Sequence, residues 1–473
     1  MTASISTLHA RSAIVVNPDL IAKYDRPGPR YTSYPTADRF VEGYGPAQHL
    51  LTLQNRRKVA PDRPLSLYVH VPFCNTICFY CGCNKVVTKN HSRSEKYLRY
   101  IECEVELVSK HLTGSRCVDQ LHLGGGTPTF LSADELSQLI AIFSKHFQMG
   151  AADANREFSI EIDPRTVDTD KIETLAKLGF NRMSVGVQDF DEAVQRAVNR
   201  IQSEAETAAA IDCARANGFT SVNIDLIYGL PKQNVIGFGV TLDRVIAMKP
   251  DRIALYSYAH LPTLFKPQRR IADEDIPTAE ARLQILALSI QKLGDAGYVY
   301  IGMDHFALPH DELAIAASQA KLQRNFQGYS TRPDCDLLAF GVSAISNIGN
   351  TYSQNVKGLD QYYDSLDRNE LPILRGVELN EDDLLRREVI QTLMCDFELS
   401  LPDFEAAHLI NFRDYFADEW IMLQQFEREK LIEIDHDRIR FTPGGRMLVR
   451  VVAMAFDRYL KLGMVQKRYS KLI

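Results

Sequence analysis

The chain has 473 residues, a formal net charge of −6, 45% hydrophobic residues and 24% charged residues. This length predicts roughly two or three domains, and the composition is that of an ordinary globular protein. The negative charge provides no long-range attraction for nucleic acid or an anionic membrane, and no block of Lys and Arg provides it locally. We therefore expect neither as a partner.

The N-terminal segment MTASISTLHARSAIVVNPDL lacks a charged start followed by a sustained apolar core. No run of about 18 apolar residues occurs elsewhere. We therefore expect a cytoplasmic protein, in a compartment that keeps thiols reduced. Nine scattered cysteines are then a poor disulfide framework, and a tight group of them indicates metal or redox chemistry.

Residues 1–60 are predicted to form an N-terminal arm. The segment Lys23–Pro35 contains three prolines, which fix local dihedral angles and suppress helix. The arm is either a surface linker or a lid over a substrate, and Arg26, Arg30 and Tyr31 are the residues expected to close over it.

Residues 61–378 alternate between apolar, β-branched runs and helical patterns. This alternation predicts a parallel sheet with right-handed crossovers, in a barrel or a doubly wound sheet. Only six clear units appear, so we expect an α/β fold with an incomplete (β/α)6 barrel. The expected strands are 65–73, 119–123, 157–162, 182–187, 221–227 and 252–258, and the expected helices are 93–112, 132–147, 168–178, 203–217, 237–248 and 278–296.

Polar and glycine residues gather where these strands end. Parallel α/β folds build their active sites at the carboxyl ends of strands, so these residues are candidates for a site. They include Cys74 after the first strand, the run Gly124–Pro128 after the second, Glu161–Asp163 after the third, Gln188 and Asp189 after the fourth, Asp225 in the fifth, and Ala259 and His260 after the sixth.

Residues 379–473 are predicted to form a helix-rich C-terminal domain. The run Leu431–Phe441 alternates like a hairpin, with Asp435–Asp437 at its turn, and Thr442-Pro443 precedes a last helix. Helices with a short hairpin resemble a winged helix, which would bind DNA. This segment has 14 Lys and Arg against 17 Asp and Glu, so a domain that covers the barrel is the better interpretation.

Four of the nine cysteines lie within ten residues, in the run CNTICFYCGC at Cys74–Cys83. A structural zinc site would use four thiolates, usually as two pairs separated by a long loop, in a small domain. The spacing C-x3-C-x2-C is instead that of a [4Fe-4S] cluster held by three thiolates, with Cys74, Cys78 and Cys81 as ligands. Zinc, packing and disulfides remain alternatives.

Three thiolate ligands leave one iron open. An open iron can chelate the amino and carboxylate groups of S-adenosylmethionine, and one electron then yields methionine and a 5'-deoxyadenosyl radical. Cys83 cannot be a fourth ligand, because that would close the cluster. It is either inert packing or, as we prefer, a residue that assists turnover near the substrate.

The cysteine run resembles the radical S-adenosylmethionine superfamily, with the aromatic Tyr80 directly before Cys81. In that superfamily an aromatic residue here lies near the adenine. The segment Gly124–Pro128 resembles its glycine motif for the methionine amino group. A glycine-rich turn alone is weak evidence, but its place one βα unit after the cysteines supports the match.

Further stretches resemble the oxygen-independent coproporphyrinogen III oxidases (dehydrogenases) of haem biosynthesis, and the resemblance covers nearly the whole chain. Related radical enzymes that act as haem chaperones share the barrel and are the alternative. The stretches are KYDRPGPRYTSYPT at Lys23–Thr36, CGCNK at Cys81–Lys85, VQDF at Val187–Phe190, AVNR at Ala197–Arg200, YAHLP at Tyr258–Pro262, GMDHF at Gly302–Phe306, RNFQGY at Arg324–Tyr329 and RYSKLI at Arg468–Ile473.

The resemblance implies oxidative decarboxylation of two propionates of coproporphyrinogen III, giving protoporphyrinogen IX. It implies a monomer with an electron-donor protein such as flavodoxin or ferredoxin. It also implies two bound S-adenosylmethionine molecules, with Asp225 and Glu161 suited to ribose hydroxyls and Arg200 to a carboxylate. The implied contacts are Tyr68, Tyr80, Gly125, Gly126, Thr127, Glu161, Gln188, Arg200, Asp225, Ala259, Gln327 and Ile345.

Two other classes of protein stay open from the residues. A flavin- or nicotinamide-dependent oxidoreductase would have G-x-G-x-x-G after the first strand, where the cysteines lie instead. A non-enzymatic haem-binding or DNA-binding module is the other class. Dispersed histidines at strand ends are more often hydrogen-bonded scaffold than metal ligands, and we assign no metal to His70, His122, His260 or His305.

Overall fold

The computed structural model describes residues 14–150 and 156–461, and the chain divides into two compact units. The larger unit consists of Phe40–Arg282 and Asp334–Glu378. The smaller unit consists of Met1–Arg39, Leu283–Pro333 and Leu379–Ile473. The sequence analysis divided the chain by role, into an arm, a barrel and a C-terminal domain, and these domains do not coincide with the two compact units. That division by role stays a prediction.

Six parallel strands form the centre of the larger unit, and they are the six that the sequence predicts. Each pairs in parallel with the next along the chain, so their carboxyl ends share one edge. Their side chains are largely buried, as expected of a sheet covered by helices. They are β1 (Leu65–Val71), β4 (Val118–Gly125), β5 (Glu157–Ile162), β6 (Arg182–Gln188), β7 (Ser221–Tyr228) and β8 (Arg252–Ser257).

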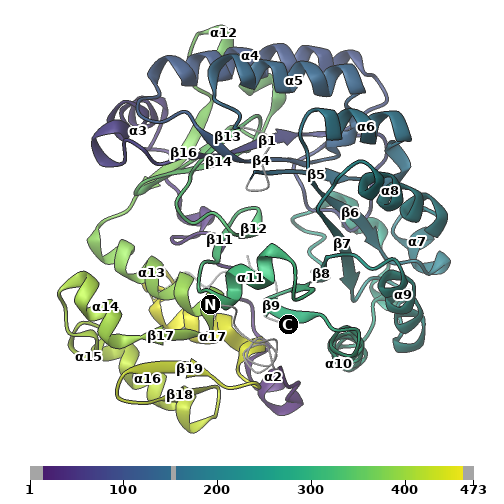
Figure 1. The fold of residues 1–473 in the computed structure, drawn as a ribbon. Coiled ribbons are helices and arrows are strands. Elements are labelled where there is room, and N and C mark those ends of the chain that lie inside the picture. Colours follow the sequence, from purple (N-terminus) through teal and green to yellow (C-terminus); the bar gives the residue numbers. More distant parts are fainter. Residues whose placement is uncertain (1–13, 151–155, 462–473) are drawn as a thin grey trace. The chain divides into compact units, whose positions relative to one another are not determined.

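Helices connect these strands and cover the outer face of the sheet (Figure 1). Two of them begin with a capping box, Ser132 with Glu135 and Ser203 with Glu206, which explains where the helical pattern starts. The predicted helices are confirmed within about two residues. They are α4 (Ser92–His111), α5 (Ala133–His146), α6 (Thr169–Lys177), α8 (Glu204–Ala216) and α9 (Val235–Ala247), with a short extra helix α7 (Glu192–Ala197), and α10 (Ala279–Asp295), which follows β8 and from Leu283 onward belongs to the smaller unit.

The sheet continues beyond the six predicted strands, so the predicted number of strands in it was too low. Strand β13 (Asp336–Phe340) pairs in parallel with the free side of β1. Three antiparallel strands extend the sheet from there. No βα pattern reveals them, because β13 is followed by a turn rather than a helix. They are β14 (Ile345–Ile348), β15 (Thr351–Asn355) and β16 (Ile373–Glu378), with helix α12 (Leu359–Asp367) between the last two.

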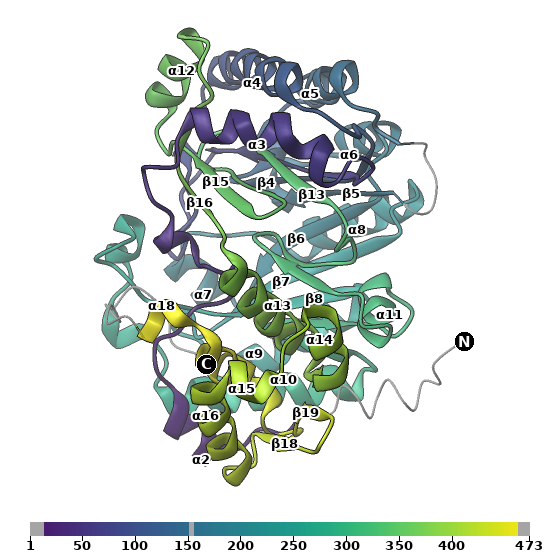
Figure 2. The same ribbon diagram turned by 90° about the vertical axis from the view of Figure 1, so that its left-hand side faces the viewer.

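The predicted arm contains a long helix that the sequence analysis did not anticipate, α3 (Pro46–Val59). Pro46 occupies its first turn, where a missing amide hydrogen has no cost. Its apolar and polar residues are not segregated, so no helical period marks it. It packs on α4, β14 and β16 of the larger unit (Figure 2). Residues 46–59 are therefore a structural part of that unit.

The smaller unit contains helices and short hairpins. The predicted hairpin is confirmed: β18 (Ile432–Ile434) pairs antiparallel with β19 (Arg438–Phe441). Among the described residues, no helix combines the length and the hydrophobicity needed to span a membrane. The other elements are α2 (Pro18–Tyr24), β9 (Val299–Gly302), β10 (His305–Ala307), α11 (Glu312–Ser318), β11 (Gln323–Asn325), β12 (Gly328–Ser330), α13 (Glu381–Asp396), β17 (Glu398–Ser400), α14 (Leu401–His408), α15 (Phe412–Tyr415), α16 (Ala417–Arg428), α17 (Val449–Ala453) and α18 (Arg458–Lys461).

Two tyrosines of the N-terminal segment belong to the core of the smaller unit. Tyr31 and Tyr34 are 1% and 0% exposed. The Tyr31 hydroxyl donates to Asp457 Oδ2 at 3.0 Å, and the Tyr34 hydroxyl accepts from the Arg458 amide at 3.3 Å. This segment is therefore packed through buried aromatic rings. Whether it also closes over a substrate stays a prediction.

Candidate active site

The cysteine run of residues 74–83, hereafter the cysteine loop, leaves the carboxyl end of β1. A parallel bridge between β2 (Phe73–Cys74) and β3 (Val86–Val87) fixes its two ends. Within the loop, the Cys81 amide donates to the Cys78 carbonyl at 3.3 Å, which forms a tight turn. These backbone bonds bring the four thiols to one side of the sheet edge.

The cysteine loop forms one wall of a pocket of about 440 Å³ in the larger unit. The opposite walls come from the carboxyl ends of β4 to β7. Twelve residues predicted from the sequence line this one pocket, although they come from five different strand ends. They are Cys74, Cys78, Tyr80, Cys81, Cys83, Gly125, Gly126, Thr127, Glu161, Gln188, Arg200 and Asp225.

The thiols of the cysteine loop differ in acidity. A hydrogen bond from Cys83 lowers the pKa of Cys81 to about 6. Burial raises the pKa of Cys74 to about 11, and the same hydrogen bond raises that of Cys83. Cys83 faces the pocket and its side chain is accessible. A thiolate at Cys81 near neutral pH is the form that binds iron.

The donor set fits an iron-sulfur cluster better than a single ion. In the described part of the chain, no three His, Cys, Asp or Glu side chains come together closely enough to hold one metal ion. Thiolates around a cluster bind separate irons, so they line a cavity instead of meeting at a point. Cys74, Cys78 and Cys81 have this arrangement, which fits the cluster inferred from their spacing.

Two buried polar atoms at the pocket also indicate a ligand. Gln188 Oε1 and Arg200 Nε have no hydrogen-bond partner within residues 14–150 and 156–461, and both side chains line the pocket. Buried polar groups are nearly always paired in native proteins. A bound molecule with polar groups, such as S-adenosylmethionine, would supply the missing partners.

The glycine turn after β4 packs directly against the cysteine loop. Gly125 has φ of +116°, and a Cβ there would lie 2.7 Å from the His70 ring. A Cβ on Gly126 would lie 2.8 Å from the Pro72 backbone. The Thr127 hydroxyl donates to Cys74 Sγ at 3.4 Å. Only glycine fits at these two positions, and the turn holds one wall of the pocket against the other.

Glu161 is held by a group of ring side chains. The His122 ring contacts Glu161 Oε1 at 3.4 Å and Ser159 Oγ at 2.6 Å, and Tyr68 stacks on His122 with 5.8 Å between centroids. The Gly125 amide donates to Glu161 Oε2 at 3.2 Å. Burial alone would raise the pKa of Glu161, but the His122 contact and the Gly125 amide, with the charge of His70, together outweigh burial and hold the pKa below the usual value. The carboxylate is therefore ionised and ready to accept hydrogen bonds.

The guanidinium of Arg200 lines the pocket and contacts three acceptors. Its Nη1 lies 3.2 Å from Asp163 Oδ2 and 3.7 Å from Cys78 Sγ, and its Nη2 donates to the Gly186 carbonyl at 2.6 Å. Asp163 also accepts from Arg165 Nη2 at 2.6 Å. Two arginines around one carboxylate leave a net positive charge, which suits an anionic group such as a carboxylate.

Asp225 is oriented by its neighbours on the sheet. Ser184 Oγ and Asn223 Nδ2 each donate to it at 2.8 Å. Burial raises the pKa of Asp225 to about 6. A buried carboxylate in this position can accept hydrogen bonds from hydroxyl groups of a sugar.

Four of the predicted contacts are not in the lining of this pocket. Tyr68 lies behind it and stacks on His122. The Ala259 carbonyl accepts from Gln268 at 3.1 Å, and Ile345 begins β14. Gln327 belongs to the smaller unit. Conversely, the sequence analysis gave no role to several lining residues, although Asp163 was noted at a strand end. These residues are Lys85, Asp163, Arg165, Ser184 and Tyr256.

The strand-end histidines His70, His122 and His260 form hydrogen bonds within the fold, as predicted. His70 Nε2 lies 2.9 Å from the Asn84 carbonyl, and its Nδ1 lies 3.1 Å from the Tyr68 hydroxyl. His260 lies between Tyr258, at 2.8 Å, and Asp273, at 3.0 Å. His305 packs edge-on against Tyr329.

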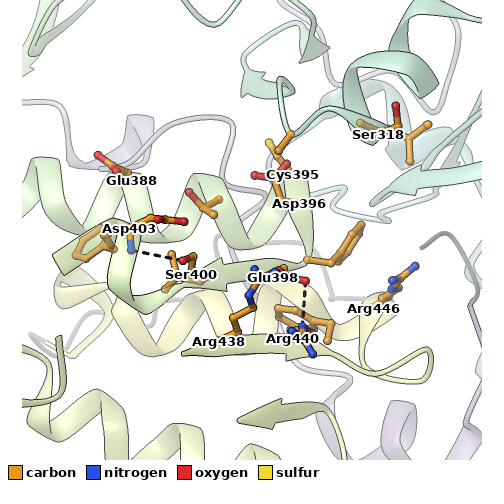
Figure 3. Close-up of a pocket in the computed structure, with 18 of the residues that line it drawn as sticks. Ser318, Glu388, Cys395, Asp396, Glu398, Ser400, Asp403, Arg438, Arg440 and Arg446 are labelled. Atoms are coloured by element: carbon orange, nitrogen blue, oxygen red, sulfur yellow. Dashed lines mark hydrogen bonds and ion pairs between the residues drawn. The ribbon is translucent and has the colours of Figure 1, made fainter. Parts of the chain in front are cut away.

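A larger cavity of about 740 Å³ lies within the smaller unit (Figure 3). Its arginines Arg438 and Arg440 both pair with Glu398, so their charge is largely neutralised inside the unit. Its one thiol, Cys395, is buried, and burial raises its pKa. This cavity therefore lacks the group of reactive side chains that marks the pocket at the cysteine loop.

Comparison with known proteins agrees with this geometry. Residues 68–245 match the model of the radical SAM superfamily, and residues 379–448 match the model of the HemN C-terminal domain. A solved structure of coproporphyrinogen III oxidase (HemN) from Escherichia coli, described as a radical SAM enzyme, superposes with a TM-score of 0.89. At 45% identity, the match covers 94% of this chain and 100% of that one.

Curated relatives match over almost the whole chain. The oxygen-independent coproporphyrinogen III oxidase of Pseudomonas aeruginosa is 51% identical over 455 residues, which are 96% of this chain and 98% of that protein. The Escherichia coli protein of the same name is 46% identical over 454 residues, with the same coverage. The chain belongs to the oxygen-independent coproporphyrinogen III oxidase family of radical SAM enzymes.

Proposed function

We propose that this protein converts coproporphyrinogen III to protoporphyrinogen IX by oxidative decarboxylation of two propionate side chains to vinyl groups. The observation that carries the proposal is the pocket at the cysteine loop. There, three thiols at the spacing of a [4Fe-4S] cluster face a glycine turn, two carboxylates and a buried arginine. The relatives that share this chain from end to end carry the name of that activity.

Each cofactor has residues of this chain to hold it. Cys74, Cys78 and Cys81 would ligate the cluster, and Arg200 would bind the carboxylate of S-adenosylmethionine. Asp225 and Glu161 would accept hydrogen bonds from its ribose. Together the two cofactors supply a carbon radical able to abstract hydrogen from a propionate β-carbon. The surrounding walls would exclude water from that radical.

Several finer features belong to the same proposal. The six parallel strands, β1 and β4 to β8, would act as an open (β/α)6 barrel that admits a tetrapyrrole. Tyr68, Ala259, Gln327 and Ile345 would contact S-adenosylmethionine, of which two molecules would bind. The enzyme would work as a monomer in the cytoplasm with a flavodoxin or ferredoxin as electron donor.

Cys83 has a separate place in the proposal. It lines the pocket and hydrogen-bonds to Cys81, so it lowers the pKa of that cluster ligand. A fourth ligand would close the cluster to S-adenosylmethionine. We therefore assign Cys83 to turnover of the substrate, through proton or electron movement or through the shape of the pocket.

The test is an anaerobic assay of reconstituted protein with coproporphyrinogen III, S-adenosylmethionine and a chemical reductant. We expect porphyrin products with two vinyl groups, together with methionine and 5'-deoxyadenosine. Formation of 5'-deoxyadenosine without any vinyl product would indicate a radical enzyme that acts on another substrate. Absence of both, in protein that contains its cluster, would contradict the proposal.

A further inference from the structure

The outer side of the cysteine loop is covered by two partly exposed segments of the larger unit. The first is Val198–Ile201, where Val198 O accepts from the Phe79 amide at 2.9 Å and Asn199 Nδ2 donates to Ile77 O at 2.7 Å. The second is the 3-10 helix η4 (Lys266–Arg270) with the residues before it. Arg200 is the one residue of these two segments that lines the pocket, and the other residues lie outside the lining, on the side of the loop away from the radical chemistry.

Each segment contacts either a predicted cluster ligand or the residue next to one in the chain. Arg200 contacts Cys78 Sγ at 3.7 Å, and the next residue, Ile201, is 60% exposed. The Arg270 guanidinium lies 5.1 Å from the centre of the Phe79 ring, directly after Cys78 in the chain. These contacts make the outer side of the loop a short path between solvent and the thiols.

Gln268 provides a further link on this side. Its Nε2 donates to the Tyr80 carbonyl at 2.9 Å, and Tyr80 precedes Cys81. The Phe265 ring packs over Gly82, where a Cβ would lie 3.0 Å from it. Helix η4 and the residue before it therefore contact the loop at two points, so a molecule that docks on the helix would lie close to the cluster.

The charge of this surface is opposite to that of the whole chain. Residues 259–271 contain Lys266, Arg269 and Arg270 and no acidic residue, whereas the chain has a net charge of −6. All three are exposed, and within the described residues none forms an ion pair with a carboxylate. The acidic residues that follow are partly engaged, since Asp273 pairs with His260 and Asp275 with Lys232.

Apolar side chains complete the surface. Leu264, at 55% exposed, flanks the basic residues, and Ile201 lies on the other segment. Protein interfaces commonly combine an apolar centre with a charged rim, and complementary charges mainly raise the rate of encounter. We call Ile201, Leu264, Lys266, Arg269 and Arg270 the basic patch.

We propose that the basic patch is the docking surface for the electron donor, an acidic one-electron carrier protein. The inference rests on the proposed function, because only a cluster in the cysteine loop requires an electron there. In the step itself one electron leaves the reduced carrier, which is oxidised, and reduces the cluster, and no bond is formed or broken. An acidic carrier would be repelled by the rest of a chain of net charge −6 and attracted to this patch.

The test compares the unchanged protein with the charge reversal Lys266→Glu/Arg269→Glu, using purified flavodoxin as the probe. Arg270 is left in place because its contact with Phe79 supports the loop. Binding of flavodoxin is measured by interferometry at low and high salt, with and without the cluster. We expect an association rate about ten-fold lower in the variant at low salt, and no difference at high salt, where the charges are screened.

A second measurement follows reduction of the cluster by its visible absorbance. Reduced flavodoxin should reduce the cluster of the variant more slowly, while reduced methyl viologen, a small cation, should reduce both proteins equally. The control reversal Arg57→Glu/Lys58→Glu, in the last turn of α3, should leave both rates unchanged. The milder variant Lys266→Gln/Arg269→Gln should give an intermediate effect if the reversal destabilises the fold.

Three outcomes would overturn the inference. One is equal binding and reduction by flavodoxin in all variants. Another is an equal loss with flavodoxin and methyl viologen, which would indicate damage to the loop. The third is a raised KM for coproporphyrinogen III in the assay driven by methyl viologen, which would assign the patch to the substrate carboxylates. Failure of the proposed function differs, because the unchanged protein would then give no porphyrin product with methyl viologen.

Discussion

Asp163 and Arg200 form a buried ion pair, with 3.2 Å between Oδ2 and Nη1 and less than a tenth of either side chain exposed. The pair holds the guanidinium between Cys78 and Gly186, where the carboxylate of S-adenosylmethionine is expected. We infer that Asp163 is a positioning residue that acts through Arg200. Burial raises its pKa, but the hydrogen bonds and positive charges of Arg165 and Arg200 together outweigh burial and keep the pKa below its usual value.

The change Asp163→Asn should therefore weaken S-adenosylmethionine binding while leaving the cluster in place. The amide keeps the shape but loses a charge-assisted hydrogen bond, which costs about 1.5 kcal/mol, or roughly ten-fold in affinity. The Kd and the KM for S-adenosylmethionine should both rise by that factor, with iron content unchanged. The matched control Asp168→Asn, at the N-cap of α6, should bind normally. Unchanged binding in Asp163→Asn would remove its positioning role.

Replacement of Cys74, Cys78 or Cys81 by Ala should abolish formation of 5'-deoxyadenosine. Each variant would lose one thiolate of a three-ligand set, so the reconstituted protein should contain little iron and lack the visible absorbance of a cluster. The control Cys117→Ala changes a thiol outside the pocket and should reconstitute fully. A variant that keeps a normal cluster and normal turnover would remove that cysteine from the ligand set.

Replacement of Cys83 by Ser should separate cluster assembly from substrate turnover. Ser retains a hydrogen-bond donor toward Cys81, so iron content and the cluster spectrum should stay near normal, while porphyrin product falls sharply. The control Cys103→Ser alters an exposed thiol on α4. Loss of the cluster would make Cys83 a ligand or an assembly residue, and full activity would reduce it to packing.

Glu104 should make the stability of the larger unit depend on pH. Its carboxylate accepts from the Gly341 amide at 2.8 Å, Asn355 Nδ2 at 2.7 Å and the Tyr362 hydroxyl at 2.5 Å. Burial outweighs these bonds and raises its pKa from 4.5 to about 7. Glu104 therefore keeps its proton to a higher pH in the folded protein than in the unfolded chain. The resulting contribution to stability is fully present below about pH 4.5 and is lost as the pH rises to about 7.

Urea denaturation at pH 5 and pH 8 measures this effect in the unchanged protein and in Glu104→Gln. The raised pKa of Glu104 corresponds to a loss of up to about 3 kcal/mol in the free energy of unfolding when the carboxyl group ionises. We expect the unchanged protein to lose more stability across this interval than Glu104→Gln, which cannot ionise. Equal pH dependence of the two proteins would show that Glu104 has the same pKa in the folded protein as in the unfolded chain.

The sequence predicted those parts of the fold and site that leave a local pattern. The six parallel strands, β1 and β4 to β8, and their helices follow an apolar period, and the cysteine loop follows a fixed spacing. The glycines were predicted from a resemblance, and their role is explained by backbone contacts at Gly126 that no local pattern reveals.

The parts that were missed depend on contacts between distant residues. Helix α3 has no apolar stripe, and β13 has no helix after it, so only their neighbours in the sheet determine them. In the sequence Arg165 has no feature that distinguishes it from a surface arginine, and only its ion pair with Asp163 places it at the pocket. A single sequence contains no signal for such a pairing.

The hydrogen bond between Tyr31 and Asp457 joins residues 426 positions apart in the chain. A ribosome adds about 5–20 residues per second, so roughly 20 to 90 s pass between synthesis of the tyrosine and synthesis of its partner. During that time Tyr31 and Tyr34 lack the core that buries them, and all residues of the larger unit leave the ribosome. The smaller unit is thus the last part of the molecule to fold during translation, although it contains residues made before the larger unit.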